Sequence, residues 1–288
     1  MGKFDKYMIV SDMDGTFFGE KAAILENNLE AIRYFRENGG VFTFASGRDY
    51  VVLGYQYPQL SKVVSCPAVL CNGSYLYDFE KKELSFEIGL DQDELHSVVS
   101  RIEAEIPEAT YRISCDLGFL CPPDKAIPFP ANRVEFFEKI IVRDYYTNHK
   151  DIVWHKLVFS SNGMKGAASD GLSDVDGNFI PKIEKLLQTI ELKNIEVTTS
   201  APTLLELMPK GASKGKALKK LKQLYPDRVA ICVGDYCNDL DMLQAADIAA
   251  CPENALDVVK NICTIHLCHH RDGCIADLIY KLDSSTKE

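Results

Sequence analysis

Short apolar runs alternate with a helical period over the first part of the chain. Residues 7–10 (YMIV) are apolar and end at acidic residues and glycine, which is typical of a buried parallel strand. The apolar positions of residues 24–38 follow a helical period that a glycine pair closes. The strand pattern returns at residues 41–45 (VFTFA) and 68–71 (AVLC). Strands and helices that alternate at these lengths predict a parallel α/β sheet with helices on both faces.

The pattern of apolar and polar residues changes at about Leu84. There a helix-like stretch precedes proline-rich, strand-prone segments, among them the breaker cluster PPDKAIPFP. The alternation then resumes with a helical pattern at residues 214–224 and a buried strand at 229–233 (VAICV). We therefore predict one discontinuous α/β domain, made of residues 1–83 and 199–288, into which an α+β domain of residues 84–198 is inserted.

The composition is that of a soluble globular protein. Apolar residues make up 46% and charged residues 26% of the 288 residues, which argues against a disordered or coiled-coil chain. The formal net charge of −10 repels nucleic-acid phosphates and anionic lipid heads, so we expect neither nucleic acid nor membrane as a partner. A small phosphate ester can still bind an acidic protein where a metal cation and local donors reverse the field at one site.

The sequence offers no targeting segment and no disulfide framework. No apolar run near the start suits a signal peptide, and no stretch of about 18 apolar residues occurs, so we expect a cytoplasmic protein with no obligate protein partner. The ten cysteines form no C-x-x-C pair, and we expect reduced thiols. The Cys and His residues between 263 and 270 match no standard zinc spacing, so we interpret them as loop or core residues.

Two aspartates follow the first predicted strand directly. Asp12 and Asp14, in the run DMDGT, lie at the carboxyl end of a strand, where ligands gather in open α/β sheets. One intervening residue places the two carboxylates close enough to hold a hard cation between oxygen ligands. Gly15 allows a tight turn, and Thr16 can offer a hydroxyl group. On these five residues alone, a capped turn made of common turn residues is the alternative interpretation.

Other predicted strands end in polar residues that suit the same chemistry. The run GDYCND brings two further carboxylates, Asp235 and Asp239, and paired aspartates at two strand ends are the ligand set expected for Mg²⁺. Ser46-Gly47-Arg48 offers a hydroxyl group, a backbone amide and a guanidinium group to a phosphoryl oxygen. Cys71-Asn72-Gly73 adds an amide side chain and a flexible backbone.

The run KGASKGK at residues 210–216 is not a phosphate-binding P-loop. Three residues instead of four separate its glycines, and Ala217 follows Lys216 where Ser or Thr is required. A lysine at the start of a helix is unfavourable for the helix dipole, which makes it a candidate functional charge. Either Lys214 or Lys216 can fill that role, and a solvated surface lysine is the alternative interpretation.

In their order along the chain, the runs DMDGT, ASGR, SKGKAL and GDYCND resemble the four motifs of the haloacid dehalogenase superfamily of phosphohydrolases. The CNG and PENA runs resemble its Cof-like branch, subfamily IIB. The resemblance implies a Rossmann-like three-layer α/β/α core that carries the catalytic site. It also implies that residues 84–198 are a large α+β cap that determines substrate specificity. Ser46 stands where the family more often has Thr.

The resemblance also implies roles for individual residues. Asp12 is the nucleophile that forms an aspartyl-phosphate, and Asp14 is the general acid and base. Ser46 binds the phosphoryl group, and Lys214 neutralises charge. The implied ligands of the cofactor Mg²⁺ are Asp12, Asp14, Asp235 and Asp239. The implied phosphate- and substrate-binding residues are Gly47, Arg48, Asn72, Gly73, Asn238 and Asn254.

The expected function is a Mg²⁺-dependent phosphatase that acts on a small phosphorylated metabolite. By the resemblance, sugar phosphates, pyridoxal phosphate and flavin mononucleotide are the substrates of this branch. The chemistry agrees, because a carboxylate that attacks phosphorus needs its charge offset, and Asp14 can protonate a leaving alkoxide and then activate water. Two alternatives stay open at this point: a phosphomutase that returns the phosphoryl group to a sugar, and a non-catalytic protein that binds a phosphorylated ligand.

Overall fold

The computed structural model describes residues 2–115, 118–122, 125, 141–142, 152–161, 177–201 and 203–285. The chain divides into two compact units, unit 1 with residues Met1–Glu87 and Ala212–Glu288, and unit 2 with Ile88–Gly211. The breaker cluster PPDKAIPFP lies largely outside the described residues. Within the described part of the chain, no helix has the length and apolar character to cross a membrane.

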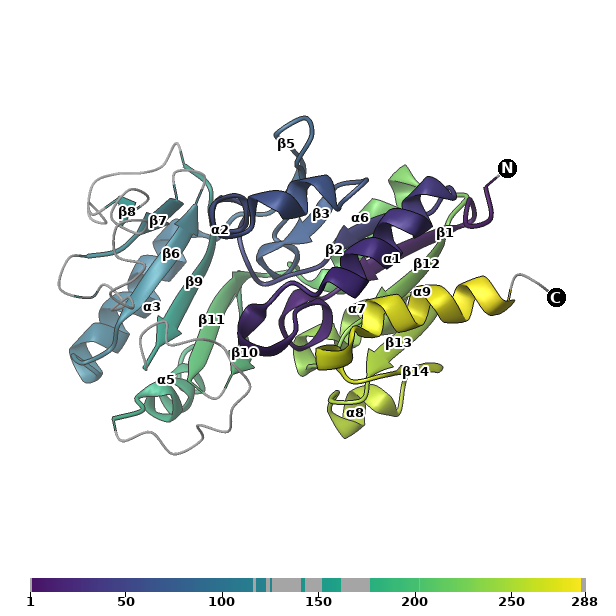
Figure 1. The fold of residues 1–288 in the computed structure, drawn as a ribbon. Coiled ribbons are helices and arrows are strands. Elements are labelled where there is room, and N and C mark those ends of the chain that lie inside the picture. The colour runs from purple at the N-terminus through teal and green to yellow at the C-terminus, as the bar shows by residue number, and fades with distance from the viewer. Residues whose placement is uncertain are drawn as a thin grey trace. The chain divides into compact units, whose positions relative to one another are not determined.

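A parallel sheet of five strands forms the centre of unit 1 (Figure 1). Its strand order is β14-β13-β12-β1-β2, so β1 lies between a strand from the end of the chain and one from its beginning. Ile9 of β1 pairs with Ile231 on one side and with Phe42 on the other. The strands are β1 (Tyr7–Ser11), β2 (Val41–Phe44), β12 (Val229–Val233), β13 (Ile248–Pro252) and β14 (Ile265–Leu267).

Helices cover both faces of this sheet, which confirms the predicted three-layer α/β/α arrangement. The alternating side chains of β1 divide between two apolar clusters, with Ile9 in one and Met8 in the other. On the face of Ile9 lie α1 (Glu26–Glu37) and α9 (Cys274–Ser285), which pack side by side (Figure 1). The opposite face carries α6 (Lys214–Leu224), α7 (Leu240–Ala245) and the short α8 (Asp257–Lys260).

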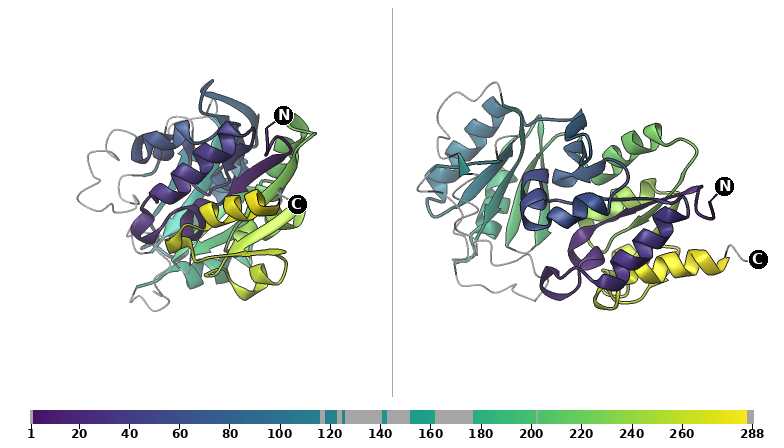
Figure 2. Two further views of the ribbon diagram at one scale, coloured as in Figure 1. Left: turned by 45° about the vertical axis from the view of Figure 1, so that its right-hand side comes forward. Right: turned by 45° about the horizontal axis from the view of Figure 1, so that its top comes forward.

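The start of the described chain and the end of α9 lie on the same side of unit 1 (Figure 2). Lys3 forms an ion pair with Asp283 near the end of α9. Neither β14 nor α9 is among the elements that the sequence pattern predicts. The apolar run of β14 is only three residues long. The apolar positions 275, 278, 279 and 282 of α9 do follow a helical period, which the sequence analysis missed.

The strand predicted at residues 68–71 extends the parallel sheet by a single bridge. β3 (Ala68–Leu70) meets the chain just after β2 through Ala45 and Val69, and then pairs antiparallel with β4 (Tyr75–Asp78). β4 pairs in turn with β5 (Glu83–Glu87), so this small sheet stays with unit 1. The predicted domain boundary after residue 83 therefore falls inside β5. Between β2 and β3 lies α2 (Tyr50–Gln56), which confirms the expected intervening helix.

Unit 2 has the α+β composition that the sequence predicts for the insert. Helices α3 (Gln92–Glu105) and α5 (Ile180–Leu187) pack with one six-stranded sheet in a single apolar cluster. The strand order is β10-β11-β9-β6-β7-β8. The strands are β6 (Tyr111–Cys115), β7 (Gly118–Leu120), β8 (Ile141–Val142), β9 (Trp154–Ser160), β10 (Ile195–Ala201) and β11 (Leu204–Pro209).

The second domain boundary lies later than the sequence predicts. β10 and β11 form an antiparallel hairpin, and β11 also pairs with β9, so both strands belong to unit 2. The predicted boundary after residue 198 therefore falls inside β10, and unit 2 continues to Gly211. An apolar run such as that of β11 is compatible with a strand of either unit, and its periodicity alone does not reveal which strand it pairs with.

We predict that truncation of Phe42 destabilises unit 1. Phe42 is fully buried in β2, and its ring lies 5.1 Å from that of Phe44 in an edge-to-face arrangement. Phe42→Ala leaves a cavity in a packed core and lowers the free energy of unfolding by about 3–5 kcal/mol, measured by urea titration. The matched control is Leu224→Ala at an exposed position of α6, which changes that free energy by no more than about 0.5 kcal/mol.

Candidate active site

The residues that the sequence singles out gather at the carboxyl ends of the parallel strands of unit 1. Asp12 follows β1 directly, and its backbone N–H donates to the carbonyl of Val233 (2.8 Å). The chain then turns through residues 13–17, where Gly15 has a φ of 81°. A Cβ atom on Gly15 would lie 2.4 Å from Asp235 Oδ2, so glycine is what lets this turn approach that carboxylate.

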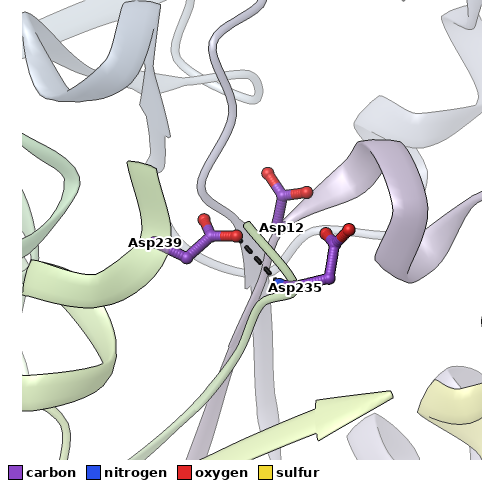
Figure 3. A group of neighbouring side chains, drawn as sticks. All are labelled: Asp12, Asp235 and Asp239. Carbon is purple, nitrogen blue, oxygen red and sulfur yellow. Dashed lines mark hydrogen bonds between the residues drawn. The ribbon is translucent and has the colours of Figure 1, made fainter. Parts of the chain in front are cut away.

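Three carboxylates converge at this edge of the sheet (Figure 3). Asp12, Asp235 and Asp239 bring ligand oxygens within 4.8 Å of one another, and no other group of three or more potential metal ligands occurs among the described residues. Thr16 Oγ1 donates to Asp235 Oδ1 (2.9 Å). Asp239 Oδ2 accepts from the backbone N–H groups of Asp235 (3.0 Å) and Tyr236 (3.1 Å), which fixes the turn after β12.

Lys214 is buried between two of these carboxylates. Its Nζ donates to Asp12 Oδ1 and to Asp239 Oδ1, each at 2.6 Å. It is the first residue of α6, and Ser213 caps the helix by accepting a hydrogen bond from the N–H of Lys216 (3.1 Å). The Lys216 side chain is exposed, so of the two candidate lysines the structure places Lys214 in the site.

One lysine does not neutralise three carboxylates, and their burial makes the ionised forms costly. Burial raises the pKa of Asp12 to about 7, although Lys214 acts in the opposite direction. Burial, with Asp12 and Asp239, raises the pKa of Asp235 well above its ordinary value. The pKa of Lys214 is raised because the two carboxylates outweigh its burial. An all-oxygen group with surplus negative charge fits a hard divalent cation such as Mg²⁺.

Asp14 is not part of this carboxylate group. Its Oδ2 and Oδ1 accept from Arg48 Nε (2.8 Å) and Nη2 (2.7 Å), a two-bond pairing. Burial tends to raise the pKa of Asp14, but the Arg48 guanidinium outweighs it and holds that pKa below its ordinary value. Arg48 itself lies 5.4 Å from the ring centre of Phe18 and 5.6 Å from that of Tyr57. The structure therefore brings together three of the four predicted metal ligands and directs the Asp14 carboxylate to Arg48.

Hydrogen bonds connect the ends of β2, β3 and β12 around Ser46. Ser46 Oγ accepts from the N–H of Arg48 (3.1 Å), and the Ser46 carbonyl accepts from the N–H of Asn72 (3.0 Å). Asn238 Nδ2 donates to Asn72 Oδ1 (3.3 Å). A Cβ atom on Gly47 would lie 3.1 Å from that same oxygen. The predicted phosphate-binding residues of these three segments are therefore neighbours in space.

The Cys71-Asn72-Gly73 turn has an unusual backbone. All three residues have positive φ values, of 48°, 51° and 92°, and for the first two residues this conformation is strained. A Cβ atom on Gly73 would lie 2.1 Å from the carbonyl oxygen of Ser213. The turn therefore packs directly against the start of α6 and helps to set the position of Lys214.

Asn254 supports the loop that carries Asp12. Its Nδ2 donates to the carbonyl of Gly15 (2.8 Å), and its Oδ1 accepts from the N–H of His270 (3.1 Å). Both ends of the amide are thus engaged with backbone groups. A part for Asn254 in substrate binding stays a prediction.

The Cys and His residues between 263 and 270 point to different partners. His266 Nδ1 lies 3.7 Å from Cys251 Sγ, whereas His270 Nδ1 lies 2.6 Å from the carbonyl oxygen of Phe18. They do not form a metal-ligand group among the described residues. The ten cysteines, all within the described residues, form no disulfide, and Cys237 is the exposed one.

Comparison with known proteins agrees with this geometry. The protein-family model of the haloacid dehalogenase-like hydrolases matches residues 9–279. The chain belongs to this family. The match confirms the family to which the sequence motifs point, and the expected enzyme class.

Relatives of this hydrolase with assigned functions are named as phosphatases. The pyridoxal phosphate phosphatase YbhA of Escherichia coli (strain K12) is 24% identical, over 95% of this chain and 97% of its own. The 5-amino-6-(5-phospho-D-ribitylamino)uracil phosphatase YwtE of Bacillus subtilis (strain 168) is 26% identical, over 88% and 89%. The structure of the HAD subclass IIB sugar phosphatase BT4131 superposes with a TM-score of 0.73 at 15% identity, over 96% and 99%, and shares the fold.

One residue of the hydrolase site escaped the sequence analysis. Asp241, in the first turn of α7, accepts from the N–H of Gly215 with its Oδ2 (3.0 Å) and so ties α7 to the start of α6. A Cβ atom on Gly215 would lie 2.4 Å from the Asp241 carbonyl oxygen. Asp241 follows Asp239 by two positions, but nothing in the sequence pattern indicates that the two helices begin side by side.

We predict that Gly73→Ala destabilises the hydrolase, because the new Cβ meets the Ser213 carbonyl and alanine disfavours a φ of 92°. The free energy of unfolding falls by at least about 1–3 kcal/mol, measured by urea titration. Gly54→Ala is the matched control in α2, where a Cβ atom has no neighbour within 4 Å and a helical Ala gains about 0.5–1 kcal/mol. Equal stability of the two variants would contradict the packing of the turn on α6.

Proposed function

We propose that this hydrolase is a Mg²⁺-dependent phosphatase that cleaves a small phosphorylated metabolite through an aspartyl-phosphate on Asp12. The observation that carries the proposal is the Asp12 carboxylate itself, which lies in an all-oxygen group and is bonded to a buried lysine. The substrate class is supported by two curated relatives, which are named for pyridoxal phosphate and for a phosphorylated precursor that contains a ribityl chain. Sugar phosphates and flavin mononucleotide are further substrates of this chemical class.

Asp12 is placed to act as the nucleophile. One of its oxygens is held by Lys214 Nζ at 2.6 Å, which fixes the carboxylate and offsets its charge as an anionic phosphoryl group approaches. An Asp12 oxygen forms a bond to phosphorus while the bond from phosphorus to the leaving alkoxide breaks. Water then attacks phosphorus, the bond to Asp12 breaks, and inorganic phosphate leaves with the Asp12 carboxylate restored.

The donor set suits the metal that the proposal requires. Asp12 and Asp235 would hold Mg²⁺, with Asp239 beside them, and when bound the ion supplies positive charge that offsets the phosphoryl oxygens. Asp239 also orients Lys214 and the backbone of the turn after β12. Lys214 and Asp239 are both buried, so their pairing excludes water from this side of the site.

Asp14 is placed to move protons. It gives a proton to the leaving alkoxide in the first half of the reaction and takes one from the attacking water in the second. Arg48 bonds both Asp14 oxygens in this structure, which favours the ionised form needed as a base. As an acid, Asp14 must be released from that pairing, and phosphoryl oxygens are the natural new partners of the guanidinium. Ser46, Gly47, Asn72, Gly73 and Asn238 would contribute the remaining polar contacts to the phosphoryl group.

We predict that Asp12→Asn abolishes phosphate release, because an amide oxygen is a poor nucleophile. The turnover number falls about 10³-fold or more on pyridoxal phosphate, flavin mononucleotide and sugar phosphates, measured by phosphate release. Asp257→Asn at an exposed position of α8 is the control and keeps the activity of the original protein. Full turnover by the Asp12→Asn variant would rule out the nucleophile, and an isomerised sugar phosphate without free phosphate would indicate a phosphomutase.

Removal of divalent cations is predicted to stop the reaction. With chelator in excess, three carboxylates face one lysine, and the remaining negative charge repels the substrate. Phosphate release ceases and returns when Mg²⁺ is added in excess over the chelator. Asp235→Asn needs a higher Mg²⁺ concentration for half-maximal activity, because one oxygen ligand carries less charge. A rate that is unchanged in excess chelator would contradict the proposed mechanism.

A further inference from the structure

Four consecutive carbonyl groups of the loop after Asp12 accept hydrogen bonds from side chains. The backbone of this loop is not helical at Asp14 (φ −81°, ψ 119°) and Gly15 (φ 81°, ψ 0°). Within this loop the N–H of Phe18 donates to the carbonyl of Met13, but the carbonyl groups of residues 15–18 need partners from elsewhere when they are buried. The side-chain donors are Asn254 to Gly15 (2.8 Å), Cys274 to Thr16 (3.2 Å), Asn28 to Phe17 (3.0 Å) and His270 to Phe18 (2.6 Å).

Three of these four donors come from one distant part of the chain, residues 254–274. The two asparagines, Asn28 and Asn254, are held in turn by backbone N–H groups from residues 270–276. Asn254 Oδ1 accepts from the N–H of His270 (3.1 Å), and Asn28 Oδ1 accepts from the N–H of Ala276 (3.0 Å). The donors thus form one connected network behind the loop.

The opposite side of the loop carries the chemistry. Asp12 bonds Lys214, and Thr16 Oγ1 bonds Asp235, so a small shift of the loop displaces two of the three carboxylates, Asp12 and Asp235. The loop of residues 12–18 is therefore bonded on one side to the donor network and on the other to Lys214 and Asp235.

We propose that His270 and Cys274 are positioning residues for Asp12. His270 lies close to a carbonyl oxygen, which only accepts, so the proton is on Nδ1 and the ring acts as the donor. Cys274 is fully buried in the apolar cluster of the Ile9 face, where an aliphatic side chain would pack as well. The thiol adds the donor that the Thr16 carbonyl needs, since a buried carbonyl that loses its partner costs about 1–3 kcal/mol. Neither side chain touches the reacting atoms.

The test compares variants that keep the donor with variants that remove it. His270→Asn keeps an N–H close to the position of Nδ1, whereas His270→Ala removes it. Cys274→Ser keeps a donor at the Thr16 carbonyl, and Cys274→Ala does not. His266→Ala is the matched control, since the His266 side chain is exposed in β14 and its ring faces Cys251 Sγ and not the loop.

We expect the two alanine variants to speed hydrogen exchange of the amides of residues 15–18, measured by mass spectrometry. The donor-keeping variants and the His266 control exchange as the original protein does. Exchange needs no substrate, so this arm stands whether or not the proposed function holds. The second arm rests on the proposed function: kcat of phosphate release falls about 10–100-fold in the alanine variants, with little change in KM, because the nucleophile is misplaced.

Two results would overturn the proposal. One is unchanged exchange at residues 15–18 in both alanine variants. The other is equal loss of kcat in His270→Asn and His270→Ala, which would assign the effect to the imidazole ring and not to the hydrogen bond. If an alanine variant does not fold, the test rests on His270→Asn and Cys274→Ser. The proposal requires the exchange rate and the kcat of each of these variants to match the original protein within about threefold, and a larger change would overturn it.

Discussion

The site of this hydrolase depends on one buried ammonium group between two carboxylates. Lys214 Nζ joins Asp12, at the end of β1, to Asp239, in the turn after β12. A buried pair of this kind is costly to break from one side, since the remaining charge loses its partner. Gly73 and Gly215 lie against backbone on either side of this lysine, and neither position has room for a Cβ atom. The Lys214 charge that holds these segments together is also the one that the proposed nucleophile, Asp12, requires.

Much of the α/β core could be predicted, because its strands are buried on both faces and appear as short apolar runs with turn residues at each end. The helix at Lys214–Leu224 and the strand at Val229–Val233 have the predicted bounds. Pairing was harder to predict. Leu204–Pro209 is an apolar run like the others, yet it pairs antiparallel in unit 2. Residues 265–267 form a strand too short to stand out from the Cys- and His-rich sequence around it.

The site could be predicted as a set of strand ends but not as a set of contacts. Topology brings the ends of β1, β2, β3 and β12 together, which makes the runs DMDGT, ASGR, CNG and GDYCND neighbours. Spacing cannot show that the Asp14 carboxylate turns to Arg48 while Asp12 turns to Lys214. It also gives no signal for His270, whose ring reaches a carbonyl 252 positions earlier in the chain. Hydrogen bonds between distant segments depend on how those segments pack, and the local pattern of a single sequence does not reveal that packing.

The central claim is that Asp12 becomes covalently phosphorylated. The most direct measurement is rapid acid quench of the Mg²⁺-loaded protein turning over a substrate with a labelled phosphoryl group, followed by peptide mapping. The account predicts a label that hydroxylamine releases, as for an acyl phosphate, on the peptide that contains Asp12. A label resistant to hydroxylamine on the peptide that contains Ser46, or full turnover of the Asp12→Asn variant with no label on the protein, would contradict it.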